Sequence, residues 1–559
     1  MQRIIVIKNE TILLIVLFLL SIPVFFFILL HFVIFLKQEH EKNRSPLAEF
    51  VYIDIMFCIQ YAVLWTAGKR CCIMNAELIV FILYLLFMLG IGVYFFVKGR
   101  GTGEKEYFLG GRKMGPWVSA LSAGASDMSA WVLMGLPASI YAYGIGQSWI
   151  AIGLAIGYAL SWIFEAPRLR RFSIAADDSI TLPQYLTNRF KSSSKVLQIL
   201  CAVIFLVAYT IYAASSVKAC GTLFNTVIGL DPTIAMYIAA AIIVAYTFMG
   251  GFSAVCWTDF FQGLLMLGAL LIAPIFALGM LNAQPGHMTM EALAEANPNY
   301  WNFFPDWQTV VSGLAWGLGY FGMPHIIIRF MSVRSDKDLK KSAKIGISWN
   351  VLIILFSVAA GCIGHLFLGE VSDSSTVFIQ MVRALFPAVI SGILLSAILA
   401  ASMSTADSQL LCASSAFASD VYKPVIRKNK STDREMFWAG RYVVLIIAII
   451  AVLIASDPNS KSIMGLVENA WGIFGAAFGP AILLSLFWKR FTFKGAVAGI
   501  LVGAVVDIVW LAFIGLGVYE ILPGFVAGMI AAIVVTLIDK EPDPEIQALF
   551  DRASSGEVE

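Results

Sequence analysis

The feature that most constrains this chain of 559 residues is the recurrence of apolar runs long enough to cross a membrane. A run of about 20 such residues spans a bilayer as a helix, because lipid cannot satisfy free backbone N–H and C=O groups. The alternation over roughly 10 residues that marks a membrane β-barrel is absent. With 59% hydrophobic and 13% charged residues, the chain has too little polar surface for a large soluble globule. The sequence therefore predicts an all-α polytopic membrane protein.

Three regions are expected along the chain. Residues 1–73 form an N-terminal extension. The choice of an early start codon would also account for these residues, because Met74 directly precedes an apolar helix and resembles an ordinary start of a protein. Residues 74–538 form the membrane domain, and residues 539–559 form a short, acidic cytoplasmic tail. The extension has one or two candidate extra membrane helices, residues 12–36 and 50–66. About thirteen spans are predicted from Glu77 onward, near residues 78–97, 117–141, 148–166, 197–216, 233–250, 260–281, 310–331, 346–368, 388–415, 438–456, 464–488, 496–514 and 523–538.

The basic residues predict the orientation of these spans. Short loops rich in Lys and Arg stay on the cytoplasmic side of a membrane, and here the bases gather in alternate loops. The opposite loops hold little beyond Lys218, Arg383 and Lys461. The side before Glu77 is therefore expected to lie outside the cell. The membrane is expected to be the plasma membrane, such as a bacterial inner membrane. The basic loops are residues 98–113, 168–195, 334–344, 423–434 and 489–494.

Two predicted spans, 117–141 and 310–331, differ from the others because several glycines and a proline interrupt each. Helix breaks at membrane depth are tolerated only around a cavity or under protein cover, and paired broken spans are typical of a transporter's binding site. These are the second and the seventh predicted spans, so they lie five spans apart. Because five is an odd number, the block of helices that begins with the seventh span enters the membrane in the opposite sense to the block that begins with the second. The spacing thus predicts an inverted repeat of five plus five helices. The interrupting residues are Gly124, Gly135, Pro137, Gly313, Gly317, Gly319, Gly322 and Pro324.

The first broken span carries one carboxylate, Asp127, inside a run of small residues. An ionised Asp near the bilayer centre costs roughly 2.5–3.5 kcal/mol, so it must face water, lose its charge or meet a cation. Residues 400–407 form a second small-residue run, which contains the hydroxyls of Ser404 and Thr405. Hydroxyl, carbonyl and carboxylate oxygens are the ligands of a hard cation. We expect these two stretches to meet and bind sodium.

Structural alternatives exist for the same residues. Asp127 would serve equally as an acid bonded to backbone donors, and Ser404 and Thr405 would also allow close helix packing. The aromatic residues Trp131, Trp316, Tyr212 and Tyr320 would also fit an interfacial belt or a lipid-facing surface. Solvation or packing accounts for three further acids, which therefore receive no functional role: Asp259, Glu468 and Asp507.

A series of motifs resembles the sodium/proline symporters of the sodium:solute symporter family. The resemblance covers residues 77–538 in order and implies a LeuT-type fold, that is, a core of five plus five inverted helices with extra helices at the ends. The motifs are Gly110-Gly111-Arg112, Ser119-Ala120-Leu121, Ala125-Ser126-Asp127-Met128-Ser129-Ala130-Trp131, Gly135-Leu136-Pro137, Tyr209-Thr210-Ile211-Tyr212, Gly250-Gly251-Phe252, Trp257-Thr258-Asp259, Trp316-Gly317-Leu318-Gly319-Tyr320-Phe321-Gly322, Pro324-His325-Ile326, residues 394–405 and Phe474-Gly475-Ala476-Ala477-Phe478-Gly479-Pro480.

The resemblance also implies the roles of individual residues. Arg112 matches a cytoplasmic arginine that takes part in coupling, and Asp127 matches a carboxylate that supports sodium binding. Two positions depart from the family pattern, with Ala130 in place of glycine and Met323 in place of glutamine. The implied sodium ligands are the carbonyls of Ala125, Met128 and Ala401 and the hydroxyls of Ser404 and Thr405. The implied substrate-binding residues are Ser129, Trp131, Tyr212, Trp316 and Tyr320.

The function predicted from these observations is sodium-coupled import of L-proline, with Na⁺ as the co-transported ion and the bilayer as its surroundings. One alternative keeps the fold but carries another small solute, such as a different amino acid, a carboxylate or a sugar. A second alternative is a membrane solute sensor, which would need a partner for signalling. An enzyme is not expected, because no nucleophile, base and orienting group cluster in the sequence. The formal net charge of +2 does not indicate a nucleic-acid partner.

Overall fold

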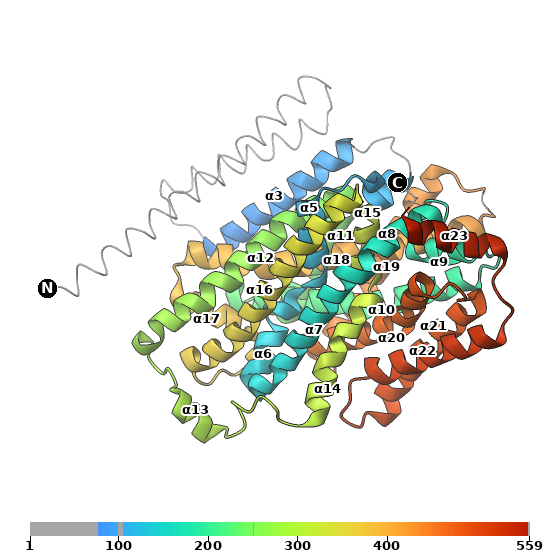
Figure 1. Cartoon of the computed structure of the whole chain (residues 1–559). Helices are drawn as coiled ribbons and strands as arrows, with labels where there is room; N and C mark the ends of the chain where they lie inside the picture. The colour runs from blue at the N-terminus through green and yellow to red at the C-terminus, as the bar shows by residue number, and fades with distance from the viewer. Residues whose placement is uncertain (1–75, 99–103, 250, 429, 557–559) are drawn as a thin grey trace. The chain divides into compact units, whose positions relative to one another are not determined.

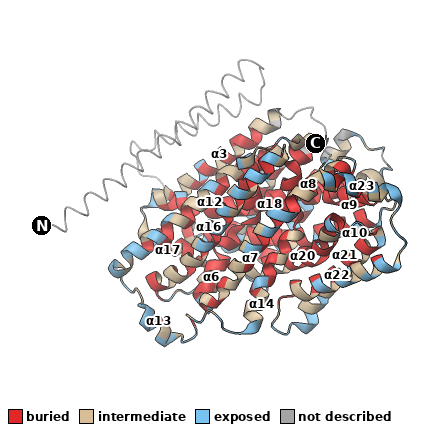
Figure 2. Ribbon diagram, viewed as in Figure 1, coloured by how far each residue is buried: buried red, intermediate tan, exposed pale blue. Residues whose placement is uncertain are grey.

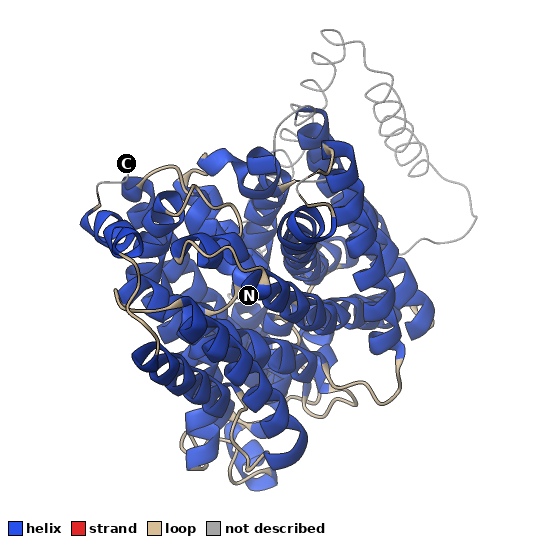
Figure 3. Ribbon diagram, turned by 90° about the vertical axis from the view of Figure 1, so that its right-hand side faces the viewer, coloured by secondary structure: helices blue, strands red, loops and turns tan. Residues whose placement is uncertain are grey.

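The computed structural model describes residues 76–98, 104–249, 251–428 and 430–556, and the candidate spans at 12–36 and 50–66 lie outside these ranges. Within them the chain is helical, with connecting loops and no strand, as Figures 1 and 3 show. The chain divides into two compact units: Met1–Asn75 with Ile82–Phe87, and Ala76–Phe81 with Met88–Glu559. Of the first unit, only residues 82–87 are described, as part of a helix. The second unit contains all the predicted site residues.

The helices follow one another without a sheet between them. The α-helices are α3 (Ala76–Lys98), α4 (Glu104–Leu109), α5 (Pro116–Asp127), α6 (Gly135–Tyr143), α7 (Ser148–Leu160), α8 (Ala166–Ala175), α9 (Leu182–Arg189), α10 (Val196–Ile228), α11 (Pro232–Met249), α12 (Phe252–Met280), α13 (Met290–Ala296), α14 (Trp307–Ala315), α15 (Pro324–Ser332), α16 (Asp336–Leu368), α17 (Val377–Leu385), α18 (Ala388–Ser415), α19 (Asp433–Ser456), α20 (Ile463–Phe487), α21 (Phe493–Val509), α22 (Ile521–Ile538) and α23 (Pro544–Ser555). Short 3₁₀ or π-helical segments are η1 (Gly110–Arg112), η2 (Ala130–Val132), η3 (Ile145–Gln147), η4 (Ser161–Glu165), η5 (Leu281–Ala283), η6 (Trp316–Phe321), η7 (Ser374–Thr376), η8 (Ala416–Ile426) and η9 (Trp510–Ile514).

Ten helical stretches in the described ranges are long and apolar enough to cross a membrane, and the bent pair Trp307–Phe321 and Pro324–Ser332 makes an eleventh. The other two predicted spans correspond to α11 and to the broken stretch from α5 to α6, whose apolar parts are shorter than a full crossing. The prediction of an all-α, multi-pass membrane protein is confirmed. The number of about thirteen spans and the inverted repeat stay predictions, because length and composition alone define the spans.

The helices differ in how much of their surface other helices cover (Figure 2). In the most apolar window of α20, 83% of the residues are buried, and in that of the α18–η8 stretch 78% are buried. The figure for the α21–η9 stretch is only 28%, and that for α22 is 33%. Because exposed apolar side chains on such helices must meet lipid, α18 and α20 are interior helices and α21 and α22 are peripheral ones.

The last described helix, α23, lies within the predicted tail. Its Phe550 ring stacks edge to face on Phe172 of α8 at 5.2 Å, and Ser554 accepts a 3.0 Å hydrogen bond from Arg168. The tail therefore includes an amphipathic helix that packs on the membrane domain through an aromatic contact.

Candidate functional site

The site is organised by the break that follows α5. The helix ends at Asp127, where Met128 has φ −79° and ψ 75° and Ser129 is extended. A single 3₁₀ turn, η2, follows before α6 resumes the span. Such a break frees carbonyl groups from the helical hydrogen-bond ladder, and within a membrane these groups need other partners. The break therefore supplies backbone oxygens to whatever lies beside it.

The structure brings most of the predicted sodium ligands together at this break. Ser404 Oγ donates a 2.7 Å hydrogen bond to Ala125 O, and Thr405 Oγ1 lies 3.4 Å from the same carbonyl. Ser404 Oγ also lies 3.2 Å from Ala401 O. All these residues are buried. Met128 is the C-cap residue of α5, and its amide donates a hydrogen bond to Gly124 O. The Ala125 and Ala401 carbonyls and the Ser404 and Thr405 hydroxyls are thus joined by short contacts between α5 and α18.

Asp127 is fully buried and is surrounded by predicted substrate-binding residues. The Tyr320 hydroxyl donates a 2.6 Å hydrogen bond to Asp127 Oδ2, while Asp127 Oδ1 has no hydrogen-bond partner among the described residues. The backbone carbonyl of Asp127 accepts from Trp131 Nε1 at 3.3 Å and lies 3.5 Å from the Tyr212 hydroxyl. Ser129 Oγ faces the amide of Trp131 at 3.5 Å. The carboxylate thus has one oxygen held and one oxygen without a protein donor.

Trp316 belongs to the second broken span, where η6 separates α14 from α15. Its carbonyl accepts a 2.8 Å hydrogen bond from Trp471 Nε1, and the Trp471 ring packs edge to face on Tyr320 at 5.1 Å. A Cβ atom at Gly319 would lie 2.0 Å from Trp471 Nε1, so only glycine allows this approach. Trp471 of α20 contacts two predicted site residues, Trp316 and Tyr320, but the sequence interpretation did not single it out, although it lies three residues before the Phe474 motif. It joins Trp316 to Tyr320 and hence to Asp127.

Arg112 lies away from these residues, in a turn where Gly110, Gly111 and Arg112 itself have positive φ values of 61°, 61° and 56°. Two glycines ease this left-handed backbone. The Arg112 guanidinium donates to Met331 O at 2.6 Å and to Asp178 Oδ1 at 2.8 Å, and so ties the loop after α8 to the end of α15. Burial lowers the pKa of Arg112, and Asp178 opposes that shift. These contacts include none of the predicted ion or substrate ligands.

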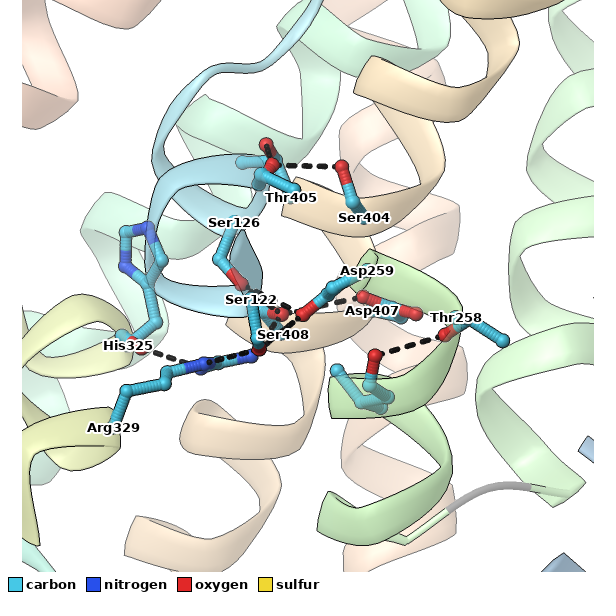
Figure 4. A network of polar contacts seen from close by, with 12 residues as sticks. Ser122, Ser126, Thr258, Asp259, His325, Arg329, Ser404, Thr405, Asp407 and Ser408 are labelled. Carbon is cyan, nitrogen blue, oxygen red and sulfur yellow. Dashed lines mark hydrogen bonds and ion pairs between the residues drawn. The ribbon is translucent and has the colours of Figure 1, made fainter. Parts of the chain in front are cut away.

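A second buried polar network lies directly beside the predicted sodium ligands, as Figure 4 shows. Asp259 Oδ2 of α12 accepts hydrogen bonds from Ser122 at 2.7 Å and Ser126 at 3.0 Å and lies 3.2 Å from Arg329 Nη2. Arg329 Nη2 also donates to Ser408 Oγ at 2.6 Å. Both charged side chains are at most 1% exposed. Asp259 is therefore one half of an interior ion pair, which solvation does not explain and which the sequence interpretation did not identify.

This arrangement of apolar helices around two breaks and a buried carboxylate defines the class of the protein as an integral membrane transport protein. Comparison with known proteins narrows the class. Residues 107–503 match the model of the family described as "Sodium:solute symporter family". The chain belongs to the sodium:solute symporter family.

Three relatives illustrate the similarity. The chain is 44% identical to the osmoregulated proline transporter OpuE of Bacillus subtilis (strain 168) over 85% of its own length and 98% of the relative. It is 42% identical to the high-affinity proline transporter PutP of the same organism, with 83% and 98% covered. It is 44% identical to the sodium/proline symporter of Haemophilus influenzae, with 86% and 98% covered.

Solved structures support the fold. The structure of a Na⁺-coupled sialic acid symporter in a substrate-bound outward-open state aligns with a TM-score of 0.69 at 21% sequence identity, over 84% of this chain and 99% of that chain. The nucleobase-cation-symport-1 family transporter MHP1 aligns with a TM-score of 0.52 at 13% identity, over 80% and 99%. At these identities the likeness concerns the fold alone, and it confirms the predicted all-α, LeuT-type fold class.

Proposed function

We propose that this protein is a sodium-coupled symporter that imports L-proline across the plasma membrane. The observation that carries the proposal is the end of α5, where the predicted ion ligands and the predicted solute residues meet within two residues of each other. Ala125 O faces the hydroxyls of α18, and Asp127 faces the aromatic side chains. The names of the relatives, proline transporters and a sodium/proline symporter, supply the solute and the ion.

Sodium is proposed to bind between α5 and α18. Its ligands would be the carbonyls of Ala125, Met128 and Ala401 and the hydroxyls of Ser404 and Thr405, each hydroxyl turning its lone pairs to the ion. Asp127, with one oxygen free of protein donors, would supply nearby negative charge. Because a carboxylate inside a membrane is costly without a cation, bound sodium would stabilise the broken end of α5.

Proline is proposed to bind on the other side of the break. Its carboxylate and its ammonium would meet the backbone donors and carbonyls that the breaks release from the helical ladder, while Trp131, Tyr212, Trp316 and Tyr320 enclose the apolar ring and Ser129 offers a hydroxyl. These aromatic side chains are at most 3% exposed. A solute therefore reaches them only when the surrounding helices move, which is the gating that alternating access requires.

The driving force is adequate for uphill import. A sodium ion that crosses about 100 mV releases roughly 2.3 kcal/mol, and a tenfold sodium gradient adds about 1.4 kcal/mol. Together they sustain a solute gradient of several hundredfold for one ion per solute, roughly 1.4 kcal/mol being needed per factor of ten. Transport by this route needs no covalent chemistry, and the proposal assigns no catalytic step to the chain.

We further propose that residues 74–538 form the symporter domain, with 1–73 as an extension and 539–559 as a cytoplasmic tail. Arg112, on the side predicted to be cytoplasmic, is proposed to act in coupling because it joins α8, η1 and α15 through four hydrogen-bond partners. A chain that starts at Met74 is expected to transport like the full chain.

The test is uptake of labelled L-proline into proteoliposomes with an inward sodium gradient, with potassium in place of sodium as the control. Accumulation that depends on sodium and collapses with a sodium ionophore is expected. Competition by unlabelled amino acids, carboxylates and sugars separates the alternatives. If another solute abolishes proline uptake at far lower concentration than proline itself does, the assignment of proline is wrong while the symporter class stands.

A further inference from the structure

Three acidic residues lie close together on α20, α21 and α22, away from the proposed sodium site. Glu468 lies on α20, Asp507 on α21, and Glu520 immediately before α22. The three helices pack against one another. Asp507 is 0% exposed and Glu520 is 6% exposed. Carboxylates buried to this degree are rare unless they are paired, so the cluster calls for an explanation.

Two of the three side chains converge on one point of α20. A Cβ atom placed on Gly472 would lie 2.9 Å from Asp507 Oδ1 and 3.2 Å from Glu520 Cγ. Glycine at this position makes room for both acids. Glu468 precedes Gly472 by four residues and so lies on the same face of α20. The Asp507 carboxylate thus points into a space that is shared with Glu520.

No protein cation forms an ion pair with Asp507 or Glu520 in the described part of the chain. Neither oxygen of Asp507 has a hydrogen-bond partner, nor has Glu520 Oε1, and neither acid takes part in an ion pair among the described residues. Lys461 favours the charged form of Glu520 without forming an ion pair with it. Lys461 Nζ donates to Asn469 Oδ1 at 3.0 Å, and Lys218 Nζ donates to the carbonyls of Ser460 and Lys461 at 3.1 Å and 2.7 Å.

Two carboxylates cannot both remain charged in such a place. Desolvation of an unpaired anion costs several kcal/mol, and a second anion nearby adds repulsion. The free lone pairs of Asp507 and Glu520 are suited to a small monovalent cation. We propose that Asp507 and Glu520 form a second cation-binding site, separate from the sodium site at Ala125, that takes up a proton or a sodium ion between two buried carboxylates.

The site adjoins the aromatic cluster of the solute site. Tyr519, next to Glu520 in the chain, packs its ring at a tilt against Trp316, with the ring centroids 5.0 Å apart, and donates a 2.8 Å hydrogen bond to Glu468 O. The Tyr519 amide also faces Ser312 Oγ of α14 at 3.0 Å. A cation bound between Asp507 and Glu520 is therefore linked to Trp316 through Tyr519, which is adjacent to Glu520 in the chain and contacts the Trp316 ring. The site itself goes beyond the proposed function and does not rest on it.

The test is infrared difference spectroscopy on the purified full chain in lipid nanodiscs, which detects the C=O stretch of protonated carboxylic acids without any transport. For a proton site, the wild type shows a protonated-acid band in potassium that only alkaline pH removes. For a sodium site, exchange of potassium for sodium at constant pH changes the carboxyl bands. In both cases the signal should fall in Asp507→Asn and in Glu520→Gln, and in the double variant only the bands of the other buried acids should remain.

Matched variants make the assignment specific. Glu295→Gln removes an exposed acid on α13 and should leave the signal unchanged. A sodium-induced signal of this site should persist in Asp127→Asn, whereas a signal that arises at the first site should not. Spectra of Asp507→Asn and Glu520→Gln that match the wild type in both the pH and the sodium differences would overturn the inference. The inference would also be overturned if neither amide variant folded. An amide has nearly the size of a carboxylate and is neutral, like a carboxylate whose charge a bound cation neutralises, so the fold should tolerate it.

Discussion

Replacement of Thr405 by alanine gives the sharpest test of the proposed sodium site. In the structure its hydroxyl lies 3.4 Å from Ala125 O, at the outer limit of a hydrogen bond, so its loss should cost the sodium-free protein little. When sodium binds, the same oxygen becomes a ligand to a charge. An interaction with a charged partner contributes about 1.5–3 kcal/mol, which corresponds to a roughly 10- to 150-fold rise in the sodium Kd.

The assay is equilibrium binding of labelled sodium to the purified protein without solute. Thr405→Ser is the matched control, because it keeps the hydroxyl and loses only a methyl group, and it should bind sodium within a few-fold of the wild type. Asp127→Asn removes a charge and should weaken sodium binding more than Thr405→Ala does. An unchanged sodium Kd in Thr405→Ala would refute the ligand assignment. Equal losses in the alanine and serine variants would show that packing of the methyl group, and not the oxygen, is responsible.

Three further outcomes are expected. Trp316→Ala should weaken proline binding far more than sodium binding in solute-free protein, and equal losses of both affinities would indicate general misfolding. Asp259→Asn should lower the free energy of unfolding by about 3–5 kcal/mol, because it leaves a buried arginine unpaired; Asp259→Asn combined with Arg329→Gln should cost less in thermal unfolding than either change alone. Burial raises the pKa of Asp178, but Lys105 and Arg112 outweigh it, so the net pKa lies below 3.8. The stabilisation from Asp178 is thus present above pH 3.8 and lost as pH falls through the lower folded-state pKa, and the Tm difference between wild type and Asp178→Asn should close only below that pH.

The sequence predicted that the second and seventh spans are broken, but not where each break falls. The first break lies at Met128 and Ser129, between Gly124 and Gly135 rather than at either glycine. Propensity cannot locate it, because Ala125 O finds its hydrogen-bond donors on α18, and Asp127 O finds donors on the Trp131 indole and on Tyr212 of α10. In the second break, Pro324 begins α15, as proline at a first helical position does, so that boundary followed from local chemistry.

The ion pair of Asp259 and Arg329 shows a different limit. Each residue lies in an apolar predicted span or at its edge, where a charge near a helix end is readily explained by solvation. Only the packing of α12 against α5 and α18, together with the serines that point between them, makes the pair interior. Trp471 was missed for a similar reason. Its role depends on contact with η6, a segment 150 residues earlier in the chain, and the spacing of residues within α20 does not reveal that contact.

The geometry at the end of α5 also accounts for how ion and solute could be coupled without a long pathway. Ala125 and Asp127 are two residues apart, yet the first faces the hydroxyls of α18 and the second faces Tyr320 and Tyr212. A cation that fixes the carbonyl of Ala125 must fix the last turn of α5, and with it the position of Asp127 among the aromatic side chains. If sodium and proline favour the same arrangement of this turn, each must tighten the binding of the other by the same factor. Weakened sodium ligation in Thr405→Ala should therefore lower the proline affinity at limiting sodium, and saturating sodium should restore it, because the aromatic residues proposed to contact proline are intact in that variant.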